Sequence, residues 1–362
     1  MAFQNKPLRV KCLALSLIYQ IDHSKLEKFF AVYNKKARYH GLLGIYSLSL
    51  LKKHSASVLY MIAPIALFVY NRSFHTRRTI EALEKAEQAA ESELVVFSDG
   101  AKDAQAIAQV NEVRAILREP WAFKKITIVE REKNWGLAAN IIDGVTKVVN
   151  AYGRVIVLED DLEISPYGLR YFNDGLDRYE QEVQVMEISG YMYPVKNVEQ
   201  LPETFFFRVA NSWGWATWKR AWADFNADIY ALTADFSKQD IKRFSIDHSE
   251  NFWKQVNAFK AGKINSWAIR WYLSIFNQGG LVLYPRRSMI QNIGTDGSGT
   301  HSDNDSMYRV MLAEKAVKYF PDKIEEHKAA YESIKHFYRH RKGNLLQRAV
   351  RYGLKLWRNK RK

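Results

Sequence analysis

Short apolar runs alternate with amphipathic helical segments near the middle of the chain, and this alternation limits the fold more than any other feature. The apolar runs lie at 65–70, 94–97, 126–129 and 155–158. Strands that are apolar throughout are buried on both faces, which is typical of parallel sheets. A repeat of strand and helix therefore predicts a doubly wound α/β sheet.

Polar residues follow each of the four predicted strands. They are Tyr70, Asn71 and Arg72 after the first, Asp99 after the second, Arg131 and Asn134 after the third, and Glu159, Asp160 and Asp161 after the fourth. Ligands of such sheets bind beyond the carboxyl ends of the strands, so these residues form a candidate site. The chain has neither G-x-G-x-x-G after the first strand nor G-x-x-x-x-G-K-[ST], which argues against ordinary dinucleotide and P-loop sites.

The acidic triplet 159–161 indicates a metal site. Neighbouring carboxylates raise each other's pKa unless a cation offsets them, and hard divalent ions prefer oxygen ligands. Along a strand, Glu159 and Asp161 face one side and Asp160 the other, so the triplet cannot give three ligands to one ion. The alternative is a solvated acidic loop before a helix that Ser165 caps and that has Pro166 at its first position.

These segments resemble the nucleotide-sugar-dependent glycosyltransferases of the GT-A fold, specifically the family-2-like bacterial sugar transferases. They are also similar to the animal N-acetylglucosaminyltransferase that starts complex N-glycan branching. The resembling segments are 64–72, 98–100, 134–137, 157–166, 212–218 and 290–294, the last leading into 299–301. The resemblance implies a GT-A (Rossmann-like) mixed sheet flanked by helices. It also implies a metal-dependent enzyme that transfers a sugar from a UDP-linked donor to a glycan or lipid-linked acceptor in cell-surface polysaccharide synthesis.

The resemblance also implies a role for each polar residue. The base and ribose would be lined by Tyr70, Asn71 and Arg72, and Asp99 would approach the base. The nucleotide-sugar would lie near Arg131 and Asn134, and its ribose and sugar would be held by Glu159 and Asp160. Asp161 would bind Mn²⁺ or Mg²⁺ at the diphosphate. Such a cation offsets the charge that develops on the leaving diphosphate.

Four tryptophans fall within the ten residues 213–222. We assign Trp213, Gly214 and Trp215 to the donor or acceptor pocket, because the flat faces of pyranoses stack well on indole. The stretch 217–225 is predicted to be helical, and its tryptophans suit either the core or a ligand.

Residues 293–301 contain three glycines and are interpreted as a mobile lid, with a surface turn as the alternative. His301 would be a second metal ligand by resemblance, although a lone histidine often has no such role.

An inverting transferase needs a carboxylate base, and the stretch 266–271 that matches the base region of the branching enzyme contains no acid. Asp296 and Glu187 are the alternative base candidates. Arg270 is expected to offset phosphate or carboxylate charge in the pocket.

The formal net charge of +15 is concentrated at the two ends of the chain. Residues 1–58 carry +8 and residues 335–362 carry +11, which leaves −4 on residues 59–334. A nucleic-acid binder is expected to be more uniformly basic, so we expect no nucleic-acid partner. Residues 344–358 form a basic amphipathic pattern that favours an anionic membrane surface, with a solvated tail or a nucleic-acid-binding arm as alternatives.

The chain has a single cysteine, Cys12, which excludes a disulfide within a monomer and a cysteine-rich zinc module. No apolar run reaches the roughly 20 residues of a spanning helix, and the N-terminus has no small-x-small cleavage site. We therefore expect a cytoplasmic enzyme, peripheral on the inner face of the cell membrane.

The expected domains are a helical basic extension (1–58), the transferase domain (59–305, divided at 165/166 into a nucleotide-binding half and an acceptor half) and a helical basic tail (306–362). Two other functions are open. A sugar nucleotidyltransferase would have a G-x-G-x-R loop after the first strand, which this chain lacks. A non-catalytic glycan-binding protein could retain the fold without a base.

Overall fold

A computed structural model of the chain describes residues 61–295 and 306–341. All of them belong to the compact unit that begins at Met61. Cys12, the expected helix over 24–53, the residues Asp296 and His301 and the basic segment 344–358 lie outside the described residues. Within the described residues, no helix combines the length and the apolar character needed to cross a membrane.

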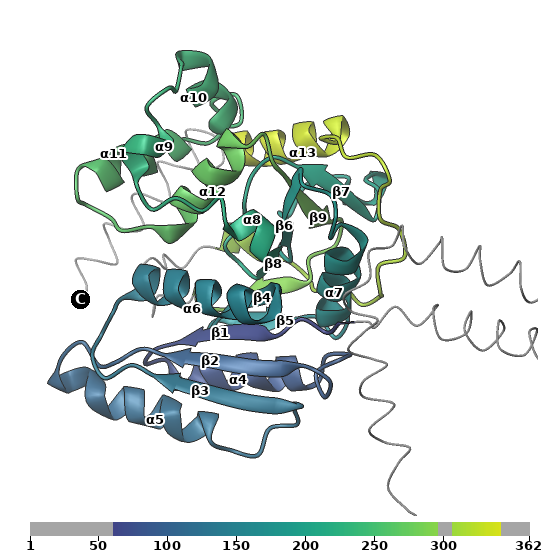
Figure 1. The fold of residues 1–362 in the computed structure, drawn as a ribbon. Helices are drawn as coiled ribbons and strands as arrows, with labels where there is room; N and C mark the ends of the chain where they lie inside the picture. Colours follow the sequence, from purple (N-terminus) through teal and green to yellow (C-terminus); the bar gives the residue numbers. More distant parts are fainter. Residues whose placement is uncertain (1–60, 296–305, 342–362) are drawn as a thin grey trace, which may run out of the picture. The chain divides into compact units, whose positions relative to one another are not determined.

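An eight-stranded mixed sheet forms the centre of the fold (Figure 1), and this confirms the predicted α/β class. Its strands are β1 (Ile65–Val69), β2 (Glu93–Ser98), β3 (Lys125–Glu130), β4 (Arg154–Glu159), β6 (Val185–Ser189), β7 (Thr204–Phe207), β8 (Trp215–Trp218) and β9 (Leu281–Pro285). Their order across the sheet is β3-β2-β1-β4-β8-β6-β9-β7. The first four strands are parallel, β8 is antiparallel to both of its neighbours, and β7 is antiparallel to β9.

Helices flank the sheet. They are α4 (Ser73–Glu84), α5 (Ile107–Leu117), α6 (Leu137–Tyr152), α7 (Gly168–Arg178), α8 (Lys219–Trp222), α9 (Ile229–Leu232), α10 (Lys238–Phe244), α11 (Phe252–Lys260), α12 (Trp267–Asn277) and α13 (Lys328–His340), with short 3₁₀ turns η2 (Ala104–Ala106), η3 (Val198–Gln200) and η4 (Ser306–Tyr308). A separate two-stranded ribbon pairs β5 (Leu162–Ile164) with β10 (Ile290–Asn292).

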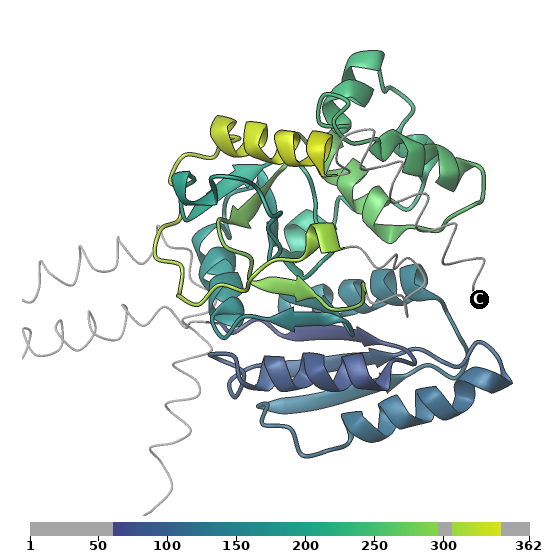
Figure 2. The same cartoon turned by 180° about the vertical axis from the view of Figure 1, so that it is seen from behind.

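The chain changes direction across the sheet at β1, and this point positions the site. It runs outward from β1 to β2 and β3, and then crosses back through α6 to β4 on the other side of β1. Helix α6 lies on one face of these strands, and α4 and α5 lie on the other (Figures 1 and 2). Ligands of open α/β sheets bind at such a switch point, outside the carboxyl ends of the strands. In this chain that place lies between the ends of β1 and β4.

Two local predictions were wrong. The helix expected to begin at Pro166 begins at Gly168, because the Ser165 hydroxyl donates to the Ala313 carbonyl and residues 165–167 form a turn. The stretch 217–225 begins as the last half of strand β8 and continues as a single helical turn. The pairing of Ala216 with Ile156 and Ile188 outweighs the helical spacing of the tryptophans.

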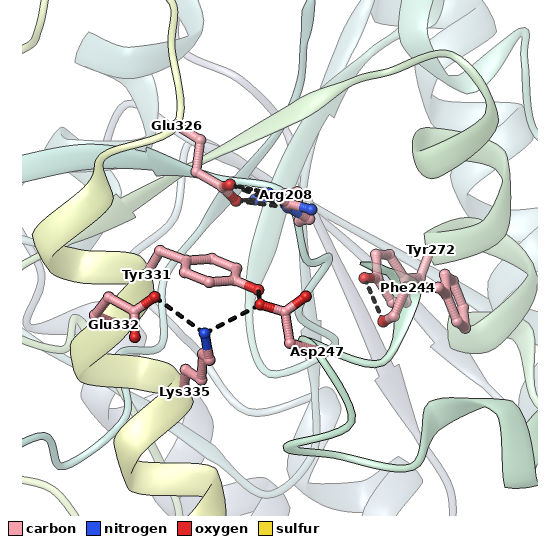
Figure 3. A network of polar contacts seen from close by, with 8 residues as sticks. All are labelled: Arg208, Phe244, Asp247, Tyr272, Glu326, Tyr331, Glu332 and Lys335. Atoms are coloured by element: carbon pink, nitrogen blue, oxygen red, sulfur yellow. Dashed lines mark hydrogen bonds and ion pairs between the residues drawn. The ribbon is translucent and has the colours of Figure 1, made fainter. Parts of the chain in front are cut away.

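Residues 306–341, which were expected to form part of a tail, pack on the core. Tyr331, Ile334 and Tyr338 of α13 are buried, and the Phe206 carbonyl of β7 accepts from the His327 N–H. Arg208 forms an ion pair with Glu326 just before α13 (Figure 3). The packed core of the fold therefore extends to residue 341.

A left-handed turn between α10 and α11 holds α13 in place. Ile246, Asp247 and His248 have φ values of 49°, 50° and 62°, a conformation that costs roughly 1–2 kcal/mol per residue for side chains other than glycine. The Asp247 carboxylate accepts from the Tyr331 hydroxyl at 2.8 Å and from the Lys335 ammonium at 3.0 Å (Figure 3). These contacts offset part of the strain and fasten the helix to the turn.

We predict that Asp247→Ala lowers the free energy of unfolding by about 2–3 kcal/mol, because it removes the acceptor of the Tyr331 hydroxyl, leaves Lys335 paired only with Glu332 and keeps a strained φ. Urea denaturation measures this loss. Asp247→Asn should lose less than half as much, since asparagine tolerates the left-handed region and still accepts from Tyr331. Asp235→Ala on the exposed surface is the matched control. Equal losses for the Ala and Asn variants would contradict this account.

Candidate functional site

The acidic triplet lies at the end of β4, at the switch point. The Asp160 carboxylate accepts from the Tyr70 N–H at 3.4 Å, and the Asp160 carbonyl accepts from the Thr79 hydroxyl at 2.9 Å. Arg72 donates to Asp161 Oδ2 at 2.7 Å, with both side chains less than one-fifth exposed. The ends of β1 and β4 are thus joined by polar contacts, as their neighbouring positions in the sheet require.

The β5–β10 ribbon brings residues 292–294 against the triplet. The Asp161 carbonyl accepts from the Ile293 N–H at 2.8 Å. A Cβ on Gly294 would lie 2.0 Å from Asp161 Oδ2 and 2.9 Å from the nearest Arg72 nitrogen. Any larger residue there would force the Asp161 carboxylate and the Arg72 guanidinium to move. The segment that begins at Ile293 therefore starts next to Asp161, the residue that the sequence analysis assigned to the metal.

The electrostatics of the triplet favour a bound cation. Burial, followed by the charges of Asp161 and Asp160, raises the pKa of Glu159 well above its usual value. Burial and the charge of Asp161 raise the pKa of Asp160 to about 7, while Arg72 acts in the opposite direction. The donor set consists of carboxylate oxygens, which suit Mg²⁺ or Mn²⁺. The triplet therefore fits a divalent cation.

The protein ligands of such a cation are few. Within residues 61–295 and 306–341, no group of three or more histidine, cysteine, aspartate or glutamate side chains is arranged to hold a metal. A cation at Asp161 would need further ligands from a bound diphosphate or from residues outside the described part of the chain, such as His301. A carboxylate pair completed by substrate phosphates is the usual arrangement for Mg²⁺.

The polar side chains that follow β2 and β3 lie close together, and their hydrogen bonds go to protein groups. They are Asp99, Arg131 and Asn134. The Asp99 carboxylate accepts from the backbone N–H groups of Gly100, Trp135 and Gly136 and from the Asn134 amide. It thereby shapes the loop that follows β3, and its side chain is buried.

Arg131 is buried as well. Its Nε donates to Asn140 Oδ1 at 3.0 Å, its guanidinium pairs with Asp143, and it lies 3.9 Å from the ring centroid of the partly exposed Trp135. The Arg131 guanidinium therefore packs against the Trp135 ring and helps to fix its position.

Tyr70 and Asn71 directly follow the carboxyl end of β1. The Tyr70 hydroxyl accepts from the Lys102 N–H at 3.1 Å, and the Asn71 amide donates to Gln109 Oε1 at 2.9 Å. Both contacts reach residues that follow β2. The ends of β1, β2 and β4 are thus brought to one edge, as the sequence predicted from strand order.

The aromatic segment 213–218 divides between core and surface. Trp215 is fully buried and stacks on Trp267 at 5.3 Å. Gly214 has a φ of 66°, and a Cβ there would lie 2.6 Å from Ile290 and 3.1 Å from Leu158. Glycine therefore lets this loop pack on β4 directly before the acidic triplet. Trp213, the preceding residue, is only partly buried.

Trp213 lines a cavity of about 300 Å³, which we call the aromatic pocket. Its fifteen lining residues include Tyr191, Trp213, Trp267, Trp271, Tyr308 and Tyr338. They come from the loop after β6, the loop before β8, α11, α12, η4 and α13. Sequence analysis found only Trp213 among these. The available signal was the cluster of aromatic residues at 267–272. That stretch was considered only for its missing acid and for Arg270.

Arg270 does not line the aromatic pocket. Its Nε donates to the Ser266 carbonyl at 3.1 Å, a terminal nitrogen donates to Asn265 Oδ1 at 2.9 Å, and the guanidinium lies 4.9 Å from the Phe259 ring centroid. Burial lowers the pKa of Arg270. In this structure Arg270 secures the first turn of α12.

Glu187 lies behind the pocket wall. Its side chain is fully buried, and its two oxygens accept from the Asn211 N–H at 2.8 Å and from the Trp271 indole N–H at 2.7 Å. Burial raises the pKa of Glu187 to about 8, although these two hydrogen bonds act against the rise. Glu187 contacts two wall residues and does not itself line the cavity.

A larger cavity of about 770 Å³ lies elsewhere. Arg208, Arg243, Asp240 and Glu326 are among its lining residues, and none of the site residues predicted from the sequence contributes to it. Because size alone does not identify a reaction centre, we assign the chemistry to the acidic triplet and not to this cavity.

A protein-family comparison identifies the middle of the chain. The model of the family described as "Glycosyl transferase family 2" matches residues 65–249, slightly more than half of the chain. The match begins at β1 and includes the acidic triplet and the aromatic segment. No curated protein sequence matches the chain.

Among solved structures, the chain is similar to residues 1–349 of S. aureus TarS, with a TM-score of 0.37, 11% identity and coverage of 64% of this chain and 61% of that one. It is similar to the mannosyltransferase PcManGT from Pyrobaculum calidifontis in complex with GDP-Man and Mn²⁺ (TM-score 0.32, 11% identity, coverage 61% and 75%). It is also similar to mouse xyloside xylosyltransferase 1 (TM-score 0.31, 15% identity, coverage 60% and 81%). At these TM-scores the neighbours carry no part of the functional argument.

We predict that, without divalent cations, stability falls as pH rises from about 4 to about 7. Asp160 has a folded-state pKa of about 7 and an unfolded value of about 3.9, so the native state binds more protons in this window and loses stability as they leave. Thermal unfolding in EDTA across this range tests the slope. Asp160→Asn should reduce the slope without abolishing it, because Glu159 and Glu187 also have raised pKa values and still contribute. A slope unchanged by this substitution would contradict the assignment.

Proposed function

Since the chain belongs to glycosyl transferase family 2, we propose that it transfers a sugar from a UDP-linked donor to a glycan or lipid-linked acceptor, with a divalent cation at Asp161. The donated sugar would be a hexose or an N-acetylhexosamine, in the synthesis of a cell-surface polysaccharide. The observation that carries the proposal is the acidic triplet at the β1–β4 switch point, in which Asp160 is buried and Asp161 contacts Arg72 and the segment at Gly294.

The side chains of the site divide the work of binding. Glu159 and Asp160 supply acceptors for ribose and sugar hydroxyls, and Arg72 supplies a positive charge within reach of Asp161 and the diphosphate. The loop held by Asp99 presents Trp135 and Asn134 at the same edge of the sheet, where the base would lie. Mn²⁺ or Mg²⁺, when bound, would offset the charge on the departing diphosphate.

The base that takes the proton from the acceptor hydroxyl is proposed to be Asp296. It follows Gly294 by two residues, and Gly294 contacts Asp161. Asp296 itself lies outside the described residues. Glu187, the other candidate, is fully buried and hydrogen-bonded to two wall residues, so we assign it to positioning that wall. The resemblance to the N-glycan-branching enzyme does not extend to its acidic pair, because 266–271 has none.

We predict that the protein binds UDP in a Mn²⁺-dependent manner, measured by calorimetry with Mn²⁺ and with EDTA. Asp161→Asn should abolish the Mn²⁺-dependent part of binding and lower donor turnover by at least about 10²-fold. It should shift the melting temperature by only a few degrees, because the lost pairing with Arg72 is offset by relief of the repulsion with Glu159 and Asp160.

The matched control is Glu163→Gln, two residues along the chain. Glu163 pairs with Arg78 on the surface, so its substitution should leave nucleotide binding unchanged. UDP binding that is identical with and without metal, or an equal effect of both substitutions, would refute the metal assignment.

We also propose that the basic C-terminal segment 342–362 binds the anionic inner surface of the cell membrane and that the enzyme acts in the cytoplasm. The sequence pattern supports this, and the segment lies outside the described residues. Deletion of 342–362 should abolish co-sedimentation with vesicles containing phosphatidylglycerol, with less effect on neutral phosphatidylcholine vesicles. Unchanged co-sedimentation of the truncated protein would remove this role.

A further inference from the structure

The walls of the aromatic pocket carry no charge. Of its fifteen lining residues in the described part of the chain, nine are aromatic and none is acidic, basic or histidine. The cavity volume of about 300 Å³ lies at the lower end of the range for small-ligand sites. Its composition differs sharply from that of the acidic triplet.

Neutral hydrogen-bonding groups are available in these walls. The indole N–H groups of Trp213 and Trp267 have no acceptor among the described residues and are open to solvent, unlike the buried indole N–H of Trp215. The Ser212 hydroxyl and the Gln255 amide also line the cavity, and neither has a hydrogen-bond partner in the part of the chain that the structure describes. These groups can exchange their water for a ligand that carries oxygen acceptors.

The charged groups nearest to the walls do not create an anion site. Glu187 contacts Trp271 from behind and brings no positive charge. Arg341 lies 4.6 Å from the Tyr338 ring centroid, but its guanidinium is paired with Glu250. A phosphate or carboxylate in the pocket would therefore be desolvated without a cation to compensate it, which is strongly unfavourable.

The pocket adjoins the donor site through Gly214. This residue packs on Leu158, directly before the acidic triplet, and on Ile290 of the ribbon that leads to Gly294. Trp213, which precedes it, forms part of the pocket wall. A group bound on Trp213 therefore lies next to the strand that carries the donor-binding residues.

We propose that the aromatic pocket binds one uncharged sugar residue of the acceptor, with its apolar ring faces on the indole and phenol rings and its hydroxyl oxygens accepting from Trp213 and Trp267. This inference rests on the proposed function and specifies its acceptor as a neutral glycan at this position. An isoprenoid chain would also contact the rings, but it would leave both indole N–H groups without an acceptor.

Ligand-observed NMR titration of the full chain tests the proposal. The neutral probes are the methyl glycosides of glucose, galactose, mannose and N-acetylglucosamine. The anionic probes are methyl glucuronide and glucose 6-phosphate, and farnesol represents a lipid chain. We expect saturable binding of at least one neutral glycoside, and at least tenfold weaker binding of the anionic probes.

Variants locate the binding. Trp213→Ala should weaken binding of the neutral glycoside by more than about tenfold, as expected for the loss of a central aromatic contact. Trp267→Phe keeps a ring but removes the N–H, and should weaken binding several-fold. Trp253→Phe is the matched control, because Trp253 stacks on Phe236 at 5.2 Å outside the pocket.

Three results would overturn the proposal: no neutral glycoside binds, an anionic probe or farnesol binds at least as tightly as the best neutral glycoside, or Trp253→Phe weakens binding as much as Trp213→Ala. Mn²⁺-dependent UDP binding is measured separately on the same samples. If UDP binds while the pocket test fails, only the acceptor inference is lost. If UDP binding fails, the proposed function is lost whatever the glycosides do.

Discussion

Mutual repulsion among Glu159, Asp160 and Asp161 is the constraint on which the rest of this site depends. The three carboxylates end a strand that is buried in the middle of the sheet, where water screens them poorly. The pKa values of Glu159 and Asp160 are raised, and Arg72 is the positive charge that contacts Asp161. A folded protein with such repulsion becomes more stable when it binds a cation. A nucleotide diphosphate commonly binds as a complex with a divalent cation.

The second half of the sheet provides a contrasting environment. Around the triplet, charge is concentrated and balanced by contacts between strand ends. Around the aromatic pocket, α11, α12 and α13 surround a cavity with rings and neutral donors, and the left-handed turn at 246–248 helps to fix these helices. A glycosyltransferase must hold a doubly charged leaving group beside a polyhydroxylated acceptor. In the proposed function the triplet and the aromatic pocket would meet these two requirements, and Gly214 lies between them.

The nucleotide-binding half was predictable because its information is local. Continuous apolar runs identified β1 to β4, and the polar residues after them met at one edge, since parallel strands end on the same side. The short ribbon β5–β10 was missed because two three-residue strands far apart in sequence leave no periodic signal. The start of the predicted helix at 217–225 was wrong, because residues 217 and 218 belong to β8 and sheet pairing by Ala216 is a long-range effect.

Side-chain roles were harder to predict than positions. Asp99 and Arg131 lie near the expected edge, but their hydrogen bonds go to protein groups, which no spacing rule reveals. Glu187 was noticed only as a carboxylate, and its burial behind Trp271 became visible only in three dimensions. The pocket itself combines six segments between Tyr191 and Tyr338, so its aromatic character could not be read from any one of them.

The most direct test of the central claim is anomalous diffraction at the manganese edge from crystals grown with Mn²⁺ and UDP. The account predicts a single strong peak beside the Asp161 carboxylate, bridging to the diphosphate, with the Arg72 guanidinium moved from its present contact with Asp161. A peak elsewhere in the molecule, or bound UDP without any peak beside Asp161, would contradict it.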